Sequence, residues 1–508
     1  MYTFQDLIEG GFLYVDKTEY VYQLIRYPKG LFFLSRPRRF GKSLLLSPLK
    51  AYFLGRRDLF EGLALFDKPL EWRSHPIIHI DLGPKGVNNP EDLQVFLRNR
   101  IDQVASEYGI SLARSSYEER FQELIERLST DGEKVVILID EYDKPILSNT
   151  ANPQIGEILR TLKSFYAVIK ATEPYQRFVF LTGVSKFSKV SVFSDLNNLT
   201  DITMAAPYAT ALGYTQRELE SNFAPLISGL AEKEGMSHED ILEKIKSWYN
   251  GYRFEEGSDT IYNPVSVMNC LSAGKFSNFW FETGTPTFLL DLMKKQEYDL
   301  AECLEEPVTE LSFSAYDAER LSPTPLLFQT GYLTITGSEV EGDIRLYQLG
   351  FPNREVEQAF GAYLIDSYAR LDKERVGVYL LHLSRHLKSR DLESFFSVLH
   401  AFFAGVPNTI TVTHEKYYQT ILYVTLRLLG LQVEVEVSTN KGRIDAVLGT
   451  PDTIYIFEFK LHGTAQEAID QIREKGYAQP WRADGREVIC VGVAFDPEER
   501  NIGEWIQI

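Results

Sequence analysis

Residues 31–43 read LFFLSRPRRFGKS, an apolar run followed by a basic loop that ends in glycine, lysine and serine. The apolar run is typical of a short buried strand, and the pattern from Lys42 onward predicts a helix. The loop carries the end of the phosphate-binding pattern GxxxxGK[ST], with Arg36 in the place of the first glycine. Gly41 lets the backbone approach phosphates, Lys42 reaches the β- and γ-phosphates, and Ser43 offers a hydroxyl to Mg2+. This stretch therefore predicts a nucleotide site at the start of an α/β domain.

Further apolar runs on both sides of this loop predict the rest of the sheet. Residues 77–80, 135–139 and 178–181 are near-continuous apolar segments separated by helical patterns, which favours a parallel α/β sheet. The middle run ends in Asp140 and Glu141. A carboxylate at the tip of a parallel strand beside a phosphate loop can hold Mg2+ together with a loop serine, and the next carboxylate can polarise the attacking water. Taken alone, the pair is explained equally well as a capped strand end.

Other residues near this predicted site have two interpretations each. Arg38 and Arg39 add positive charge against phosphate, unless they simply face solvent. Thr182 ends the next strand and is placed to hydrogen-bond the γ-phosphate or the lytic water, although an ordinary strand-end threonine explains it as well. Residues 14–18 (YVDKT) line an adenine pocket or only cap the first helix. The predicted ATP-binding set is Arg38, Arg39, Phe40, Gly41, Lys42, Ser43, Asp140 and Thr182.

The last hundred residues carry a second charged pattern. Asp445 stands in GRID, and Glu458 and Lys460 stand in IFEFK, each within or beside an otherwise apolar run. Burying two carboxylates and an ammonium is costly unless they hold a metal or pair with each other. Glu458 and Lys460 project to the same side, because strand residues i and i+2 share a face. The pattern predicts a site where Asp445 and Glu458 bind Mg2+ and Lys460 orients or activates water, with a structural ion pair as the alternative.

Composition limits the function classes. The 508 residues allow two to four domains, and a hydrophobic content of 44% excludes wholesale disorder. Three dispersed cysteines argue against a disulfide framework or a zinc module and fit a reducing cytoplasm. No apolar run approaches membrane-spanning length and the start resembles no signal peptide, so we expect a cytoplasmic protein without a membrane partner. The net charge of −18 indicates that any nucleic acid meets a local groove.

Four regions are predicted along the chain. Residues 1–205 form the P-loop core, and 206–300 form a helical, aromatic-rich lid. An acidic stretch then marks the start of 301–404, where a winged-helix-like helix and hairpin precede further helices. Residues 405–508 form the second α/β domain.

The motifs together resemble a known family. YVDKT at 14–18, RPRRFGKS at 36–43, LIDEYDKP at 138–145 and LTGVSKFSK at 181–189 are similar to the AAA-ATPase-like family of bacterial and archaeal proteins. The resemblance extends to about residue 285, and Arg36 belongs to that family's usual pattern. Members often carry a C-terminal PD-(D/E)XK nuclease domain, which residues 412–507 resemble. This second resemblance implies that Glu415, at the start of a helix, completes the metal shell and that Gln471 supports the site from the following helix.

The expected function follows from both sites. We expect an ATP-binding and ATP-hydrolysing protein whose ATPase gates a Mg2+-dependent nuclease, with Mn2+ as the alternative metal. DNA is the expected partner, and a role in defence against foreign DNA rests on analogy. Two alternatives stay open: a nucleotide-dependent switch whose nuclease fold only binds nucleic acid or protein, and an ATPase motor whose nuclease is incidental. Assembly into a homo-oligomer and the arginine finger also stay open. The expected catalytic residues are Glu141, Asp445, Glu458, Lys460 and Gln471.

Overall fold

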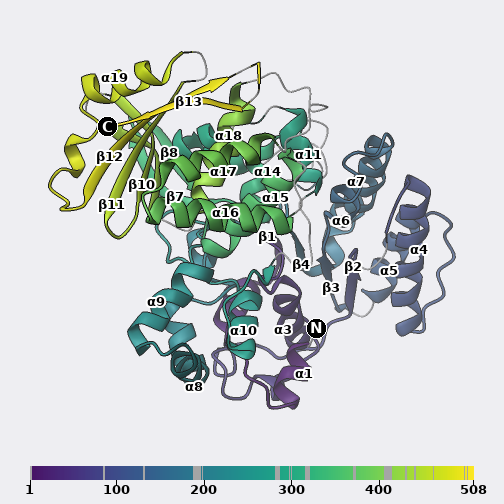
Figure 1. Cartoon of the computed structure of the whole chain (residues 1–508). Coiled ribbons are helices and arrows are strands. Elements are labelled where there is room, and N and C mark those ends of the chain that lie inside the picture. The colour runs from purple at the N-terminus through teal and green to yellow at the C-terminus, as the bar shows by residue number, and fades with distance from the viewer. Residues whose placement is uncertain are drawn as a thin grey trace. The chain divides into compact units, whose positions relative to one another are not determined.

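The computed structural model describes residues 3–83, 86–129, 132–186, 196, 198–280, 287–296, 298, 300–314, 321–369, 373–404, 415–429, 432–439, 442–460, 463–496, 498–499 and 501–508. The chain forms two compact units. The first comprises Met1–Thr283 and Pro307–Glu355, and the second comprises Gly284–Glu306 and Val356–Ile508 (Figure 1). The four-part division stays a prediction, since the structure groups the predicted hairpin region with the first unit and the helices that follow with the second.

A parallel sheet forms the centre of the first unit. Its strands are β1 (Gly30–Ser35), β2 (Ile77–Asp81), β3 (Val135–Asp140), β4 (Gln176–Gly183) and β5 (Thr200–Asp201). They lie in the order β2-β3-β4-β1-β5, and every neighbouring pair is parallel. All positions of β3 are buried, as expected for a strand covered on both faces. The predicted parallel α/β sheet is therefore confirmed, and the carboxyl ends of β1, β3 and β4 meet along the edge where such sheets bind ligands.

Helices surround this sheet. They are α1 (Phe4–Glu9), α2 (Thr18–Ile25), α3 (Lys42–Phe53), α4 (Pro90–Glu107), α5 (Tyr117–Leu128), α6 (Lys144–Leu147) and α7 (Ile155–Ala171), with a 3-10 turn at Arg57–Phe60. The helices α4, α5 and α7 pack against one another (Figure 1). Side chains cap the starts of α1, α4 and α5. Ser116, for example, accepts the backbone N–H of Glu119, whose side chain bonds back in a capping box.

A helical subregion follows the sheet. It consists of α8 (Gln216–Glu234), α9 (His238–Tyr249) and α10 (Pro264–Ala273), and a turn of Gly235 at φ +66° ends α8. The three helices enclose their own apolar core, in which Phe223, Ile241 and Val267 are almost wholly buried. This core corresponds to the predicted helical lid.

The rest of the first unit is a small antiparallel sheet with short helices. Its strands are β6 (Val308–Thr309), β7 (Thr334–Glu341) and β8 (Ile344–Gly350), in the order β6-β8-β7. The helices α13 (Leu311–Ser314) and α14 (Pro323–Thr330) precede the β7–β8 hairpin. The expected helix leading into a hairpin is thus confirmed.

The second unit combines helices with a mixed sheet. The helices are α11 (Thr287–Lys295), α12 (Leu300–Glu305), α15 (Arg354–Ala369), α16 (Lys373–Lys388), α17 (Leu392–Ala404), α18 (Glu415–Arg427) and α19 (Ala465–Lys475). The strands are β9 (Gln432–Thr439), β10 (Gly442–Gly449), β11 (Thr453–Lys460), β12 (Glu487–Asp496) and β13 (Asn501–Gln507), in the order β13-β12-β11-β10-β9. Only β11 and β12 pair in parallel. The helix α19 connects these two strands and packs on both (Figure 1), which buries Ile469 and Ile472 against the sheet.

Two further expectations concern the whole chain. Cys270, Cys303 and Cys490 are buried and form no disulfide among the described residues. Within the described ranges, no helix combines the length and the apolar character that crossing a membrane requires.

Candidate functional site

The phosphate-binding loop runs from the end of β1 to the start of α3. Gly41 caps α3 at φ +95°, and Arg39 also adopts a positive φ of +66°. Such a backbone suits glycine and is strained for arginine, which is typical of a loop shaped for a ligand. Lys42 is buried, and its Nζ donates to the carbonyls of Arg36 and Pro37, each at 3.0 Å. Burial lowers the pKa of Lys42, while the charges of Asp143 and Asp140 oppose that shift.

Arg36 explains why this loop lacks its first glycine. The side chain is 1% exposed, and its Nη1 donates to the carbonyls of Ser35 (2.9 Å) and Thr203 (2.6 Å). Its Nη2 donates to the carbonyl of Tyr208 (3.1 Å), and the guanidinium lies 4.1 Å from the ring centre of Phe254. Burial lowers the pKa of Arg36 to about 9, so the guanidinium remains charged at neutral pH. Arg36 is therefore a buried anchor that ties the loop to the segment after β5.

Aromatic residues hold the tip of the loop. Phe40 is 1% exposed and packs edge-on against Tyr252 (4.8 Å between ring centres) and Phe254 (5.7 Å). The indole Nε1 of Trp280 donates to the carbonyl of Arg38 at 3.3 Å. Phe40 thus packs inward, whereas the Arg38 side chain is exposed. Sequence reasoning placed Trp248–Phe254 in the lid but missed that this segment contacts the loop.

The predicted magnesium ligands lie beside the loop. Asp140 is buried at the end of β3, and the exposed Ser43 side chain hydrogen-bonds to it, which lowers its pKa. The net pKa of Asp140 is nevertheless raised, because burial outweighs that bond. Glu141 follows at φ +48°, a strained conformation, and burial together with the charge of Asp140 raises its pKa. The charge of Lys42 partly offsets these crowded carboxylates, and their oxygen atoms fit a hard divalent ion such as Mg2+.

The end of β4 is organised by a residue that sequence reasoning missed. Asp143 is 1% exposed and accepts hydrogen bonds from the N–H groups of Val184 (3.0 Å) and Ser185 (2.6 Å) and from the Ser185 hydroxyl (2.6 Å). This carboxylate joins the loop after β3 to the loop after β4. The sequence feature that could have identified Asp143 is its position within the motif LIDEYDKP at 138–145. Thr182 donates its hydroxyl to the carbonyl of Leu34 (2.8 Å), so its role at the γ-phosphate stays a prediction.

Residues 14–18 have structural partners. Asp16 accepts from the N–H groups of Thr18 and Ala64, each at 2.8 Å, and Lys17 pairs with Glu218 at 2.7 Å. These bonds account for the segment as a cap and a contact with α8, and a part in an adenine pocket stays a prediction.

The second candidate site lies on β10, β11 and α19. Ala446 of β10 opposes Phe457 of β11, so Asp445 and Glu458 flank this pair at neighbouring positions. Asp445 Oδ2 accepts the backbone N–H of Phe459 at 2.6 Å. Lys460 Nζ lies 3.2 Å from Glu458 Oε1 and 2.6 Å from Gln471 Oε1, and the Gln471 amide also donates to Glu458 Oε1. The structure thus brings together four of the predicted residues.

Electrostatics at this site favour a cation. Burial raises the pKa of Glu458 to about 7, and the charge of Asp445 adds to the shift, while Lys460 opposes it. Burial also raises the pKa of Asp445. Glu458 Oε2 is buried and has no hydrogen-bond partner among the described residues. A divalent ion between the two acids would satisfy this oxygen, so the donor set fits the expected Mg2+.

Two further residues bear on this centre. Tyr477, which sequence reasoning did not assign, is 2% exposed and hydrogen-bonds through its phenol to Gln471. Glu415 is the first residue of α18, but its side chain lies outside the described part of the structure. Among the described side chains, no group of three or more His, Cys, Asp or Glu is arranged around one point, so Asp445 and Glu458 stand as a pair.

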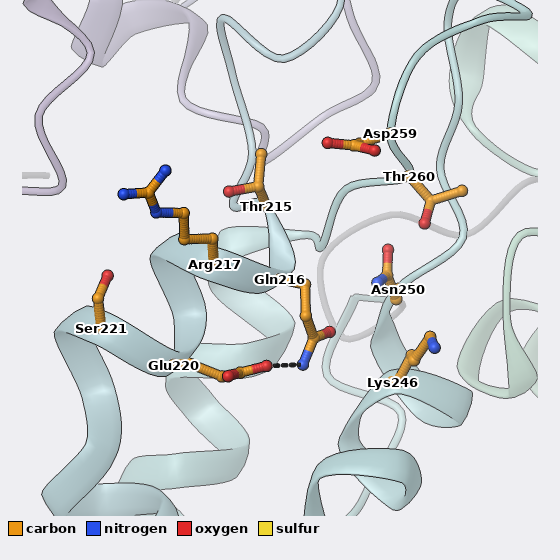
Figure 2. Close-up of a pocket in the computed structure, with 9 residues that line it drawn as sticks. All are labelled: Thr215, Gln216, Arg217, Glu220, Ser221, Lys246, Asn250, Asp259 and Thr260. Atoms are coloured by element: carbon orange, nitrogen blue, oxygen red, sulfur yellow. Dashed lines mark hydrogen bonds between the residues drawn. The ribbon is translucent and has the colours of Figure 1, made fainter.

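A polar pocket of about 800 Å3 lies in the helical subregion (Figure 2). It is lined by Thr215, Gln216, Arg217, Glu220, Ser221, Lys246, Asn250, Asp259 and Thr260. Two cations and two carboxylates face it, and Gln216 donates to Glu220 at 2.7 Å across one wall (Figure 2). These mixed charges favour no single class of ligand, and no residue of the phosphate loop contributes to the lining.

Comparisons with known proteins match the two regions of the chain that contain these sites. A family model described as "Predicted AAA-ATPase" matches residues 1–193, and one described as "PD-(D/E)XK nuclease superfamily" matches residues 413–505. A protein of Azotobacter chroococcum mcd 1, named "Uncharacterized protein in vnfD 5'region", is 36% identical over 515 residues, which span 98% of this chain and 96% of that relative. The resemblance inferred from the sequence motifs is confirmed.

Solved structures give a weaker likeness. The Aeropyrum pernix ORC1 protein in complex with DNA is 12% identical over 68% of this chain and 91% of its own, with a TM-score of 0.25. The Cdc6p protein of Pyrobaculum aerophilum is 12% identical over 72% and 92% of the two chains, with a TM-score of 0.24. At such scores the likeness carries no functional argument.

Proposed function

This chain belongs to the AAA-ATPase-like proteins that carry a C-terminal PD-(D/E)XK nuclease superfamily domain, and on this premise we propose that it hydrolyses ATP and cleaves phosphodiester bonds in nucleic acid. ATP turnover gates the cleavage in this proposal. DNA is the substrate that we favour, and defence against foreign DNA is the role that fits such a pairing.

One observation carries the nuclease half of the proposal. The buried Glu458 carboxylate has an unpartnered oxygen beside Asp445, while Lys460 and Gln471 occupy its other oxygen. An unpaired buried acceptor costs stability, and a cation bound at this oxygen would offset that cost. The unpartnered oxygen therefore supports a ligand that the chain itself does not provide.

The residues divide the cleavage chemistry among them. Asp445 and Glu458 would hold a divalent ion, which supplies positive charge against the scissile phosphate and acidifies a water molecule. Lys460 is partly exposed beside Glu458, so its ammonium can face both the acids and the phosphate. Gln471 holds Lys460 by its amide oxygen, and this bond keeps the ammonium in the site as substrate enters.

The ATPase half uses the phosphate loop. Lys42 would exchange the carbonyls of Arg36 and Pro37 for phosphate oxygens, and Ser43 with Asp140 would hold Mg2+. Glu141, with a raised pKa beside this position, would orient the attacking water and accept its proton.

A cleavage assay tests the nuclease activity. Purified protein is incubated with single-stranded DNA, double-stranded DNA and RNA, with and without ATP and Mg2+. We expect Mg2+-dependent cleavage that falls by about a thousandfold in Glu458→Gln and Lys460→Met, because each removes a group from the reacting centre. Asp470→Asn is the matched control, since Asp470 is an exposed acid on the same helix as Gln471.

The same assay decides between this function and its main alternative. If the wild-type protein cleaves none of these substrates under any condition, the chain is a nucleotide-dependent switch whose nuclease fold only binds a partner. Cleavage that persists unchanged in both Glu458→Gln and Lys460→Met would show that the Asp445–Glu458 site is not the catalytic site.

A further inference from the structure

Trp280 contacts both the phosphate loop and the start of α15. Its indole Nε1 donates to the carbonyl of Arg38 in the loop at 3.3 Å. Its backbone N–H donates to Glu355 Oε1 at 2.8 Å. One residue outside the loop is therefore bonded to the loop by its side chain and to the first turn of α15 by its backbone.

Glu355 is an unusual residue for a helix start. Its side chain is 0% exposed, which is costly for a carboxylate without a compensating role. Burial raises its pKa to about 7, the Trp280 N–H opposes this shift most, Ser266 and Phe279 follow, and the charge of Arg39 opposes it least. Arg39 belongs to the phosphate loop and has a positive φ, so a change in loop conformation alters the electrostatic environment of Glu355.

Neighbouring residues reinforce this connection. The side chain of Asn353 donates to the carbonyl of Asn250 at 2.7 Å. Gly251, at φ +98°, approaches Pro352 so closely that a Cβ would lie 1.7 Å from the Pro352 carbonyl oxygen. The next residue, Tyr252, packs against Phe40 of the loop. The segment that leads into α15 thus contacts Asn250 and Gly251, the two residues that directly precede Tyr252.

The helix α15 continues from this point into the second unit. Arg354 and Glu355 belong to the first unit and the rest of the helix to the second. In the second unit, Glu357 pairs with Arg427 of α18 at 2.5 Å. Gly361 lies so close to Leu428 that a Cβ would be 2.8 Å from its side chain. The helix α18 begins at Glu415 and opens the segment matched to the nuclease superfamily.

The hydrogen bonds of Lys42 supply a reason for movement of the loop. Lys42 Nζ bridges the carbonyls of Arg36 and Pro37, on the amino-terminal side of Arg38. A phosphate that recruits Lys42 removes both bonds, so the backbone of the loop can shift at the carbonyl that Trp280 holds.

We propose that Trp280 and Glu355 are positioning residues that transmit the nucleotide state of the phosphate loop through α15 and α18 to the Asp445–Glu458 site. This inference rests on the proposed function and specifies how ATP regulates cleavage. Trp280 and Glu355 contact neither substrate. Their substitution changes the ratio of cleavage with ATP to cleavage without ATP by more than it changes ATP hydrolysis.

Three variants test the relay. Trp280→Phe removes the indole donor and keeps a ring against Tyr332, and Glu355→Ala removes the acceptor of the Trp280 N–H. Both should lower the cleavage ratio by about five- to tenfold, the range of one lost hydrogen bond, with ATP hydrolysis changed by less than about twofold. Glu355→Gln keeps an acceptor oxygen at this position and should restore a ratio close to that of wild type.

Tryptophan fluorescence can follow the change at Trp280 on nucleotide binding independently of any cleavage. Mg-ATP should change the tryptophan fluorescence of the wild-type protein, and this change should be lost in Trp280→Phe. Trp72→Phe is the matched control, because Trp72 packs on Tyr52 and Phe60 and makes no described bond to the loop. If Glu355→Ala does not fold, the cleavage ratio and the fluorescence change are both measured on the Trp280→Phe protein.

The outcomes separate the relay from the proposed function. An unchanged cleavage ratio in Trp280→Phe and Glu355→Ala, with ATP-dependent cleavage intact in wild type, overturns the relay alone. ATP hydrolysis that falls in parallel with cleavage also overturns it, since a structural defect then explains both. Wild-type cleavage that does not depend on ATP refutes the gating and the relay together.

Discussion

Restoring the missing glycine of the phosphate loop should damage this protein. The substitution Arg36→Gly recreates the pattern GxxxxGK[ST], which by motif alone should be neutral or favourable. In the structure, however, it removes the donor of three carbonyls, those of Ser35, Thr203 and Tyr208. The buried carbonyls of Ser35 and Thr203 each lose a partner at a cost of about 1–3 kcal/mol, whereas the Tyr208 carbonyl keeps the N–H of Ala211. The lost contact with the Phe254 ring costs up to about 2 kcal/mol.

These costs do not add fully. Removing the guanidinium also removes the cost of burying its charge, the effect that lowers the pKa of Arg36. We therefore expect a net loss of about 4 kcal/mol, which lies at the upper end for single substitutions. For a unit of this size the melting temperature should fall by about 6 °C. ATP affinity should fall as well, because Arg36 anchors the loop that contains Lys42.

Thermal melting and ATP titration of Arg36→Gly measure both effects. Arg38→Gly is the matched control, since it makes the same change at an exposed arginine two residues away. The melting temperature and ATP affinity of Arg36→Lys should lie between those of wild type and Arg36→Gly. Lysine keeps the positive charge but lacks the planar set of donors of the guanidinium. A glycine variant that melts within about 2 °C of wild type and binds ATP equally well would refute the anchoring role of Arg36.

Four other outcomes are expected. Phe40→Ala should destabilise the first unit by about 3 kcal/mol, measured by thermal melting, because it empties a buried site between two aromatic rings. Glu141→Gln should bind ATP but hydrolyse it about a hundredfold more slowly in a steady-state assay. The pKa of Glu355, raised from 4.5 to about 7, means that the folded chain retains a proton that the unfolded chain releases between these pH values. Stability should therefore fall as pH rises through this window, and melting curves of Glu355→Gln should show a smaller fall and a higher melting temperature at pH 8. Chelation by EDTA should abolish cleavage in a gel assay, and added Mg2+ or Mn2+ should restore it, which an ion pair between Glu458 and Lys460 alone would not predict.

Much of the fold could be predicted from short patterns. The apolar runs that end at Asp140 and Thr182 predicted the strands β3 and β4 correctly. A strand that is buried on both faces is apolar along almost its whole length, so the run of apolar residues marks it. The positions of Glu458 and Lys460 were also predicted from a short pattern. Their spacing of two residues places both side chains on one face of β11. Their common contact with Gln471 was expected only from the resemblance to the PD-(D/E)XK superfamily.

The missed residues share a physical cause. Asp143 bonds to Ser185, and Trp280 bonds to Arg38 and Glu355, across long separations in the sequence. No local pattern marks such a pair, since an aspartate in a turn or a tryptophan in a loop has many ordinary uses.

The amino-acid sequence alone determined that this chain combines a phosphate-binding α/β unit with a strand pair bearing two acids and a lysine, because strand periodicity and loop motifs depend on residues close together along the chain. Only the tertiary structure decided that Arg36 is a core anchor, that Phe40 packs inward, and that Glu355 is buried beside Trp280. Those roles depend on which distant backbone carbonyls and rings meet each side chain, and packing of the whole unit sets that.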